Sequence, residues 1–445
     1  MVTMASQQQQ VDQLFEQWAT PHSPGCRVAV VQHGEVIYAQ NYGMASLEHH
    51  IPISEETVFY IASVAKQITA ACVGILIDRG QVGYQDDIRQ YFPELPDYGQ
   101  RIEVQHLIHH TSGLRDYLEL ALVTGWQPDN LYTQAESLNR VFQQRGTNFA
   151  PGAEYLYSNT NYLLLAELVA RVSGLPFEQF AAQEVFAPLG MTARYRASTG
   201  EIIPHRASGY APLPNGGYEI TSNSLTSMGS GGAWATVDAL VKWDANFYHN
   251  RLNNHSDTLL ALLQRCTPPA QQAGVVPYAF GLMHSTYRGL PTIRHAGAFK
   301  GFCAQYLRFP AQALTIICCA NVFEFPITPK TTAIAEIFLA DEFTEPAPPE
   351  TPATAPLPAP VTLEPAQLAA VEGVYFASEL TLAVRLYVKD GQLMIQGAQG
   401  GALPLTAYAP DTFGIGMVRL LFDAKYSGFT WRGDRVRQIH FDKLM

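Results

Sequence analysis

A stretch rich in proline, alanine, threonine and glutamate between Asp341 and Pro365 constrains the fold of this chain most strongly. Such a segment cannot bury a core, and it favours an extended, semi-rigid backbone. The chain has 445 residues, 47% of them hydrophobic, whereas one core usually stops growing at about 250 to 300 residues. We therefore expect a large domain over residues 1–340, a linker over 341–364 and a small domain over 365–445.

The large N-terminal segment combines strand-like and helix-like patterns. Apolar residues between Val11 and Trp18 recur at helical spacing. The stretch from Ser63 to Asp78 is apolar on most faces, which predicts a helix buried in the domain centre. Strands at both ends with helices between them predict a mixed α/β domain. The other expected elements are strands at 26–32, 35–41, 278–285, 292–295 and 303–309 and helices at 161–172 and 176–186.

The segment after the proline-rich stretch is strand-like throughout. Apolar residues alternate with other residues from Leu382 to Val388, and Lys389-Asp390-Gly391 supplies a hairpin turn into the next strand. Further turn signals occur at Pro410-Asp411 and Gly433-Asp434. This pattern predicts a small antiparallel barrel or sandwich.

Charge and hydropathy argue against two classes of protein. The formal net charge of -11 disfavours nucleic-acid binding, because that function needs a basic surface. No apolar run approaches the roughly 20 residues that span a bilayer, and no secretory signal pattern opens the sequence. Six cysteines are scattered through apolar surroundings without the paired spacing of a zinc site or a dense disulfide framework, which is typical of buried free thiols in a reducing compartment. We expect a cytoplasmic protein.

A histidine cluster at His106, His109 and His110 suggests a metal site at first sight. However, no acidic or cysteine partner stands at a recognisable spacing from it. We interpret these histidines as structural residues and expect neither a metal nor another cofactor.

Ser63-Val64-Ala65-Lys66 places a hydroxyl at the start of the expected buried helix and an amine three positions later. Residues at i and i+3 share a helix face, so the two side chains can touch. A neighbouring base can take the serine proton, and the helix dipole favours the developing negative charge. Alone, the pattern more often marks an ordinary N-cap serine beside a surface lysine.

Two further short patterns follow along the chain. Tyr157-Ser158-Asn159 comes after a Pro-Gly turn and before a helix, which predicts an ordered loop whose tyrosine could act as a second base. Its phenol would need a nearby cation to exchange protons near neutrality. His295-Ala296-Gly297 lies at the end of an expected strand, and its small residues would let a substrate backbone approach closely. Each pattern alone is common in purely structural roles.

The combination is far more specific than its parts. SxxK, then YxN, then HxG stand in the chain order of the serine β-lactamase and penicillin-binding protein superfamily, which this sequence resembles. LIHHTSGLRDY from Leu107, PLGM from Pro188 and GSGGAWATVDALVKW from Gly229 are similar to its branch near class C enzymes. That branch includes D-aminopeptidases, esterases and penicillin-binding-protein-type thioesterases. The resemblance covers the chain from Phe15 to Leu339.

The resemblance implies an antiparallel sheet with an all-helical subdomain in the catalytic domain, and a lipocalin-like barrel as the C-terminal domain. It implies that Ser63 is the nucleophile and that Lys66 and Tyr157 are the acid–base pair. His295 flanks the site as a further catalytic residue. The remaining implied site residues are the substrate contacts Asn159 and Gly297 and the oxyanion-hole amides of Ser63 and Ala298.

His295 stands where class C β-lactamases carry a lysine, so we do not expect a dedicated β-lactamase. A histidine is mostly neutral above about pH 6.5 and would attract a substrate carboxylate only weakly. We expect a serine hydrolase of the peptidase or esterase type that forms an acyl-enzyme with ester or amide substrates, D-configured peptides included. Two alternatives stay open, a peptide-cyclising acyl transferase and a non-catalytic protein that binds peptides or cell-wall fragments. The expected partner is a small-molecule or peptide substrate, and the sequence leaves the oligomeric state open.

Overall fold

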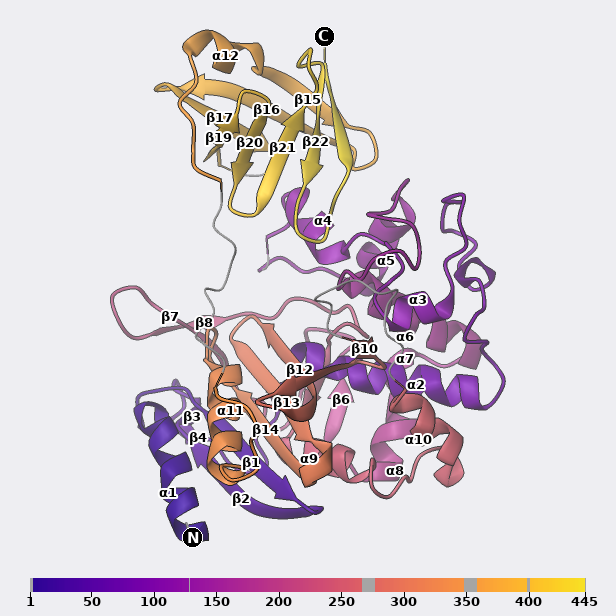
Figure 1. Cartoon of the computed structure of the whole chain (residues 1–445), viewed down its shortest axis with the longest axis vertical. Helices are drawn as coiled ribbons and strands as arrows, with labels where there is room; N and C mark the ends of the chain where they lie inside the picture. The colour runs from indigo at the N-terminus through magenta and orange to yellow at the C-terminus, as the bar shows by residue number, and fades with distance from the viewer. Residues whose placement is uncertain (1–2, 128, 266–276, 348–357, 398–400, 445) are drawn as a thin grey trace.

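A computed structural model describes residues 3–127, 129–265, 277–347, 358–397 and 401–444 (Figure 1). Its centre is a seven-stranded antiparallel sheet in the order β10-β11-β12-β13-β14-β1-β2. Because β1 pairs with β14, strands from the two ends of the large segment meet in one sheet. The strands are β1 (Cys26–Gln32), β2 (Glu35–Tyr42), β10 (Tyr278–Ala279), β11 (Leu282–Tyr287), β12 (Leu290–Phe299), β13 (Phe302–Phe309) and β14 (Leu314–Ala320).

Both faces of the central sheet are buried. Successive side chains of a strand point to opposite faces, and Ile316 and Cys318 of β14 accordingly pack with α1 (Met4–Phe15) and α11 (Ile327–Phe338). Ile317 and Cys319 pack on the other face, in the main hydrophobic core. This two-sided burial is the reason that β14 is apolar at nearly every position.

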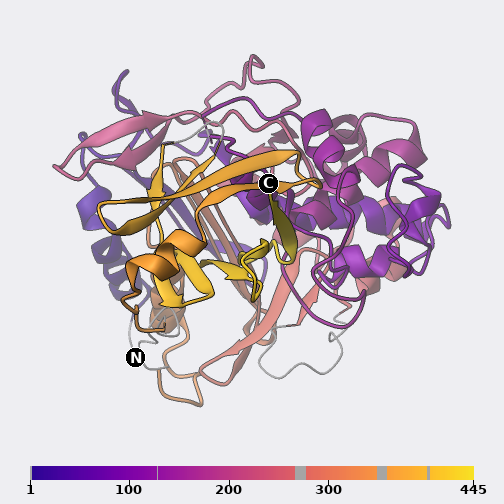
Figure 2. The same cartoon turned by 90° about the horizontal axis from the view of Figure 1, so that it is seen from above.

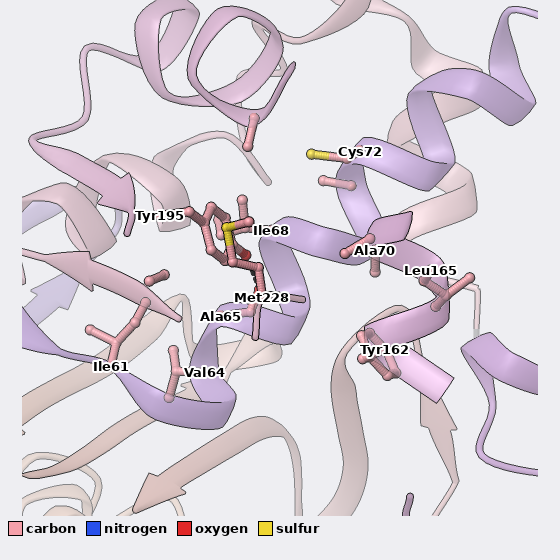
Figure 3. Packing of buried hydrophobic residues seen from close by; sticks show 14 of the residues in the cluster. Ile61, Val64, Ala65, Ile68, Ala70, Cys72, Tyr162, Leu165, Tyr195 and Met228 are labelled. Atoms are coloured by element: carbon pink, nitrogen blue, oxygen red, sulfur yellow. Dashed lines mark hydrogen bonds between the residues drawn. The ribbon is translucent and has the colours of Figure 1, made fainter. Parts of the chain in front are cut away.

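The helix that follows Ser63 runs through the main core. Ser63 itself lies in a 3-10 turn, and α2 extends from Lys66 to Asp78. Figure 3 shows residues of this segment packed against Tyr162 of α6 (Asn159–Ser173) and against Tyr195. The predicted buried central helix is confirmed, except that α-helical geometry begins at Lys66 rather than at Ser63.

The remaining helices and short strands complete the predicted mixed α/β fold, which the structure confirms. The other helices of this part are α3 (Val104–Ile108), α4 (Tyr117–Val123), α5 (Gln134–Phe142), α7 (Phe177–Ala181), α8 (Ala187–Leu189), α9 (Val237–Ala245) and α10 (Asp257–Leu263). The short strands are β3 (Met44–Ser46), β4 (Ile51–Pro52), β5 (Phe59–Tyr60), β6 (Ala193–Tyr195), β7 (Gly209–Pro212), β8 (Tyr218–Thr221) and β9 (Ala233–Ala235).

The C-terminal segment forms nine antiparallel strands that curl into a nearly closed barrel over the large domain (Figures 1 and 2). Leu382, Val384 and Leu386 fill its interior, as their alternation predicts. Of the expected linker, residues 348–357 lie outside the described residues. The elements are α12 (Pro365–Ala370), β15 (Gly373–Ala377), β16 (Leu382–Lys389), β17 (Gln392–Gly397), β18 (Leu403–Pro404), β19 (Thr406–Ala409), β20 (Thr412–Ile415), β21 (Val418–Phe422), β22 (Gly428–Arg432) and β23 (Ile439–Lys443).

Helix α4 and one barrel hairpin join the two parts. Leu120 of α4 is fully buried in the hydrophobic cluster of the barrel. In return, the loop 433–438 between β22 and β23 descends onto the large domain, where Arg115 donates hydrogen bonds to the carbonyls of Arg437 and Gln438, each at 3.0 Å. Arg115 also pairs with Glu379 of the barrel at 2.5 Å. The barrel hairpin is thereby fixed beside the segments that carry the sequence motifs.

Two expectations from composition concern thiols and membranes. Within the described ranges, Cys26, Cys72, Cys303, Cys318 and Cys319 are free and buried, whereas Cys266 lies outside those ranges. The same ranges contain no helix with the length and apolarity to span a bilayer.

Candidate functional site

The structure brings Ser63 and Lys66 together at the start of α2. Lys66 Nζ lies 3.0 Å from Ser63 Oγ, 3.0 Å from Asn159 Oδ1 and 2.5 Å from the carbonyl oxygen of Ser230. The lysine side chain is fully buried. Burial lowers the pKa of its amine well below the ordinary lysine value, and the charge of Asp116 only partly opposes this effect.

This arrangement suits a neutral amine. A neutral lysine carries two N–H donors and one lone pair, and Asn159 and Ser230 offer two oxygen acceptors for the donors. The lone pair is then left for the Ser63 hydroxyl, whose oxygen is the third neighbour. Lys66 can therefore accept the proton of Ser63.

Tyr157 lies against both residues. Lys66 Nζ is 4.8 Å from the centre of the tyrosine ring, and Ser63 lies close enough to the phenol to influence its pKa. Burial raises the pKa of Tyr157 above that of a free phenol, and the nearby hydroxyl of Ser63 and the charge of Arg435 offset part of the rise. Tyr157 is thus a neutral phenol near neutral pH, and its predicted role as a second base stays a prediction.

Asp116 is a site residue that the sequence analysis missed. Its Oδ2 accepts hydrogen bonds from the backbone N–H of Asn159 at 2.6 Å and from Asn159 Nδ2 at 2.8 Å. These bonds fix the amide of Asn159 so that its Oδ1 faces Lys66. Asp116 also caps the N-terminus of α4, and the Asp-x-x-Glu pattern at 116–119 was a capping signal in the sequence.

His295 closes another side of the site. Its Nε2 lies 3.1 Å from the hydroxyl of Tyr278, and its Nδ1 lies 2.6 Å from the carbonyl oxygen of Ala296. Burial, and then the nearby Lys66, lower the pKa of His295 to about 3. The histidine is therefore neutral at ordinary assay pH, and Tyr278 is a partner that its sequence context did not reveal.

Gly297 lets β12 cross the nucleophile segment closely. A Cβ atom at Gly297 would lie 2.8 Å from the backbone nitrogen of Ser63 and 2.6 Å from the carbonyl oxygen of Ile61. Gly297 thus lies close to the backbone of the Ser63 turn, whereas the predicted approach of a substrate backbone at this glycine stays a prediction. Ala298, the next residue of β12, lines the same cavity as Ser63, and the role of the two backbone amides as an oxyanion hole stays a prediction.

The cavity at Ser63 has a volume of about 510 Å³ and a positive lining. Arg294 of β12 and Arg435 of the barrel hairpin both line it, whereas no aspartate or glutamate among the described residues does. The guanidinium carbon of Arg435 lies 5.0 Å from the centre of the Tyr157 ring. Its Nε is 3.5 Å from the exposed carboxylate of Asp434. Neither arginine was identified from the sequence.

The histidine cluster lies outside this chemistry. His106 Nδ1 accepts a hydrogen bond from the backbone of Glu103, and His109 Nδ1 lies 2.7 Å from the carbonyl oxygen of Tyr278. His110 Nδ1 accepts hydrogen bonds from Ser158 and Asn161. Within the described ranges, no group of three or more His, Cys, Asp or Glu side chains could hold a metal ion.

Comparison with known proteins gives a consistent picture. The family model described as Beta-lactamase matches residues 11–338. A protein named D-aminopeptidase from Gluconobacter oxydans is 28% identical over 306 residues, which are 67% of this chain and 56% of the relative. A D-aminopeptidase from Brucella canis is 29% identical over 295 residues, 63% of this chain and 53% of the relative. The chain thus spans just over half the length of these relatives.

Solved structures support the fold. An octameric penicillin-binding protein homologue from Pyrococcus abyssi superposes with a TM-score of 0.67 at 19% identity, covering 98% of this chain and 99% of that chain. A D-amino acid amidase from Ochrobactrum anthropi, in complex with D-phenylalanine, superposes with a TM-score of 0.61 at 22% identity. It covers 76% of this chain and 98% of its own.

Proposed function

This chain belongs to the beta-lactamase family of serine hydrolases, and on that premise we propose that it hydrolyses ester or amide substrates through an acyl-enzyme at Ser63. The observation that carries the proposal is the environment of Lys66. Its buried amine faces the Ser63 hydroxyl while its donors are taken by Asn159 and Ser230. A serine needs such a base to become a nucleophile.

The reaction follows from this geometry. Ser63 Oγ attacks the substrate carbonyl carbon, its proton passes to Lys66 Nζ, and the backbone amides of Ser63 and Ala298 stabilise the oxyanion. Tyr157 gives its phenol proton to the leaving group as the carbon–heteroatom bond breaks, and it regains a proton from Lys66. Water then attacks the acyl-enzyme through the same residues, which releases the acid and restores the serine.

The lining of the cavity favours peptide-like substrates with a free carboxylate. Arg294 and Arg435 supply positive charge there, while His295 stays neutral. An anion is attracted to such a lining and an ammonium group is repelled. The relatives named D-aminopeptidase and the amidase complex with D-phenylalanine point to D-configured substrates. D-configured peptides that end in a free carboxylate, with and without a free amino group, are therefore the first substrates to test.

The decisive test is intact-mass analysis after mixing with a fluorophosphonate and a p-nitrophenyl ester. The wild type should gain one adduct on Ser63, Ser63→Ala should gain none, and Lys66→Ala and Tyr157→Phe should be acylated at least a hundredfold more slowly. Ser158→Ala is the control, since Ser158 is a buried serine next to Tyr157 that has no role in the proposal. Ester turnover by Ser63→Ala at the wild-type rate would refute the nucleophile. Product analysis with an added amine separates hydrolysis from acyl transfer.

A further inference from the structure

A second cavity lies beside the one at Ser63. It has a volume of about 480 Å³ and is lined by residues of the loops around β6, β7, β8 and β9, including Arg196, Arg206, Thr221 and Trp234. The two cavities are neighbours because Tyr60 lines the first and packs against Trp234, which lines the second, with 5.3 Å between ring centres. The proposed acyl transfer makes no use of this second cavity.

Two arginines meet at one face of this cavity without a counterion. The guanidinium carbons of Arg196 and Arg206 lie 5.3 Å and 5.7 Å from the ring centre of Trp234. Arg196 is only 5% exposed, and its guanidinium donates a hydrogen bond to the carbonyl oxygen of Asn223 at 2.6 Å. Among the described residues, no carboxylate lies within ion-pair distance of Arg196 or Arg206, and Glu350 is the sole acidic residue outside them.

The nearby acidic side chains are already paired elsewhere. Asp129, which lines the cavity, binds Lys300 at 2.6 Å, and Glu201 binds Arg194 at 3.2 Å. The hydroxyl of Thr221 is buried and has no hydrogen-bond partner among the described residues. A buried charge without a partner is costly, as is a buried polar group without one. The same groups become favourable when an anion occupies the space between them.

We propose that this cavity binds the remote anionic group, a carboxylate or a phosphate, of a substrate whose scissile acyl bond lies at Ser63. The inference rests on the proposed function for its kinetic consequence, but the anion site itself does not depend on acylation. Arg196 and Arg206 supply the charge, and the Thr221 hydroxyl supplies a further donor.

The kinetic test compares three p-nitrophenyl esters that share one acyl chain and end in a carboxylate, a phosphate or a neutral methyl ester, at several chain lengths. When the acyl chain is long enough for the anionic group to reach the second cavity, kcat/KM for an anionic ester should be about tenfold higher than for the neutral ester. The gain should come from a lower KM, as expected for charge-assisted hydrogen bonds. Arg206→Gln should remove most of the gain that appears at this chain length and leave the neutral ester unchanged. It should not remove the carboxylate preference that Arg294 and Arg435 give at all chain lengths. The carboxylate and phosphate esters reveal which anion is preferred.

Arg194→Gln is the matched control, because Arg194 is a nearby arginine that does not line the cavity. Arg206 is the better target because it is exposed, whereas Arg196→Gln could unfold the chain. Equal kcat/KM for all three esters at every length, or equal losses in Arg206→Gln and Arg194→Gln, would overturn the proposal.

A binding measurement separates this idea from the acyl-enzyme. Inorganic phosphate and succinate are titrated into Ser63→Ala by calorimetry at constant ionic strength. At least one ion should bind, and Arg206→Gln in the same background should weaken that binding about tenfold while Arg194→Gln does not. If both ions fail to bind, or bind equally to all variants, the anion site is refuted. If binding follows the prediction but no ester acylates the wild type, only the proposed function fails.

Discussion

Glu119→Gln should strengthen the contact between the barrel hairpin and the large domain above neutral pH. Glu119 lies in α4, and its Oε2 accepts a hydrogen bond from the backbone N–H of Arg435 at 2.6 Å. Burial first, and then the negative charges of Asp116 and Asp434, raise the pKa of this carboxyl from 4.5 to about 7. The carboxyl of Glu119 thus binds its proton more tightly when the barrel hairpin contacts the large domain (the docked state) than when this contact is broken.

The sign and size of the effect follow from that pKa. A carboxyl whose pKa is raised in the docked state stabilises the contact fully below about pH 4.5. This stabilisation of the contact is lost as the pH rises through about 7. At about 1.4 kcal/mol per pKa unit the loss is about 3 kcal/mol at most. Because Glu119 is only half-buried, water screens part of this, and we expect about 1 to 2 kcal/mol. Glutamine keeps an acceptor for the Arg435 amide and removes the charge.

Hydrogen exchange of the segment 433–438 measures the effect locally, since a protein of this size need not unfold in two states. After correction for intrinsic exchange rates, wild-type protection should fall about tenfold between pH 5 and pH 8, while protection in Glu119→Gln stays constant. Glu372→Gln is the control, because Glu372 accepts a backbone hydrogen bond from Val388 inside the barrel, away from this contact. Parallel pH profiles for the wild type and Glu119→Gln would refute the reasoning.

Three further substitutions test the site. Gly297→Ala should slow single-turnover acylation about a hundredfold, because the new Cβ would lie 2.8 Å from the Ser63 nitrogen and push β12 away from the proposed oxyanion hole. An unchanged acylation rate would contradict this role of Gly297. His295→Lys should raise kcat/KM for carboxylate substrates relative to neutral ones but lower the Tm, since it buries an ammonium group near Lys66. Unchanged selectivity at several pH values would count against it. Arg435→Gln should raise KM for carboxylate substrates about tenfold and leave neutral esters unchanged, and equal effects on both would disprove its role in selection.

The parts that sequence predicted well depend on short-range spacing. Helical and strand periodicities indicated α2, the hairpin of β1 and β2 and the barrel strand β16, because burial on one or both faces dictates which residues are apolar. The spacing of Ser63 and Lys66 predicted that their side chains would touch, and they do at 3.0 Å. Tyr157 and His295 carry no local signal that links them to Ser63, so only the family resemblance suggested that they would meet it.

The parts that sequence missed depend on contacts between distant segments. Arg435 comes from the barrel, and nothing around Gly433-Asp434 indicated more than a turn. Arg196, Arg206 and Trp234 meet through loop packing that no periodicity records. The burial of Lys66, which makes its amine a base, likewise results from the tertiary surroundings rather than from the four-residue motif.

The insertion of Leu120 into the barrel has a consequence for synthesis of the chain. Translation delivers Ser63, Lys66, Tyr157 and His295 to the folding chain before the β22–β23 hairpin leaves the ribosome. Until then Leu120 has no barrel core to enter, and the cavity at Ser63 lacks Arg435. A nascent chain therefore carries the groups of the proposed acyl chemistry before it carries the selectivity that we assign to the barrel. Until the barrel folds, the apolar side chain of Leu120 lacks the burial that it has in the finished protein.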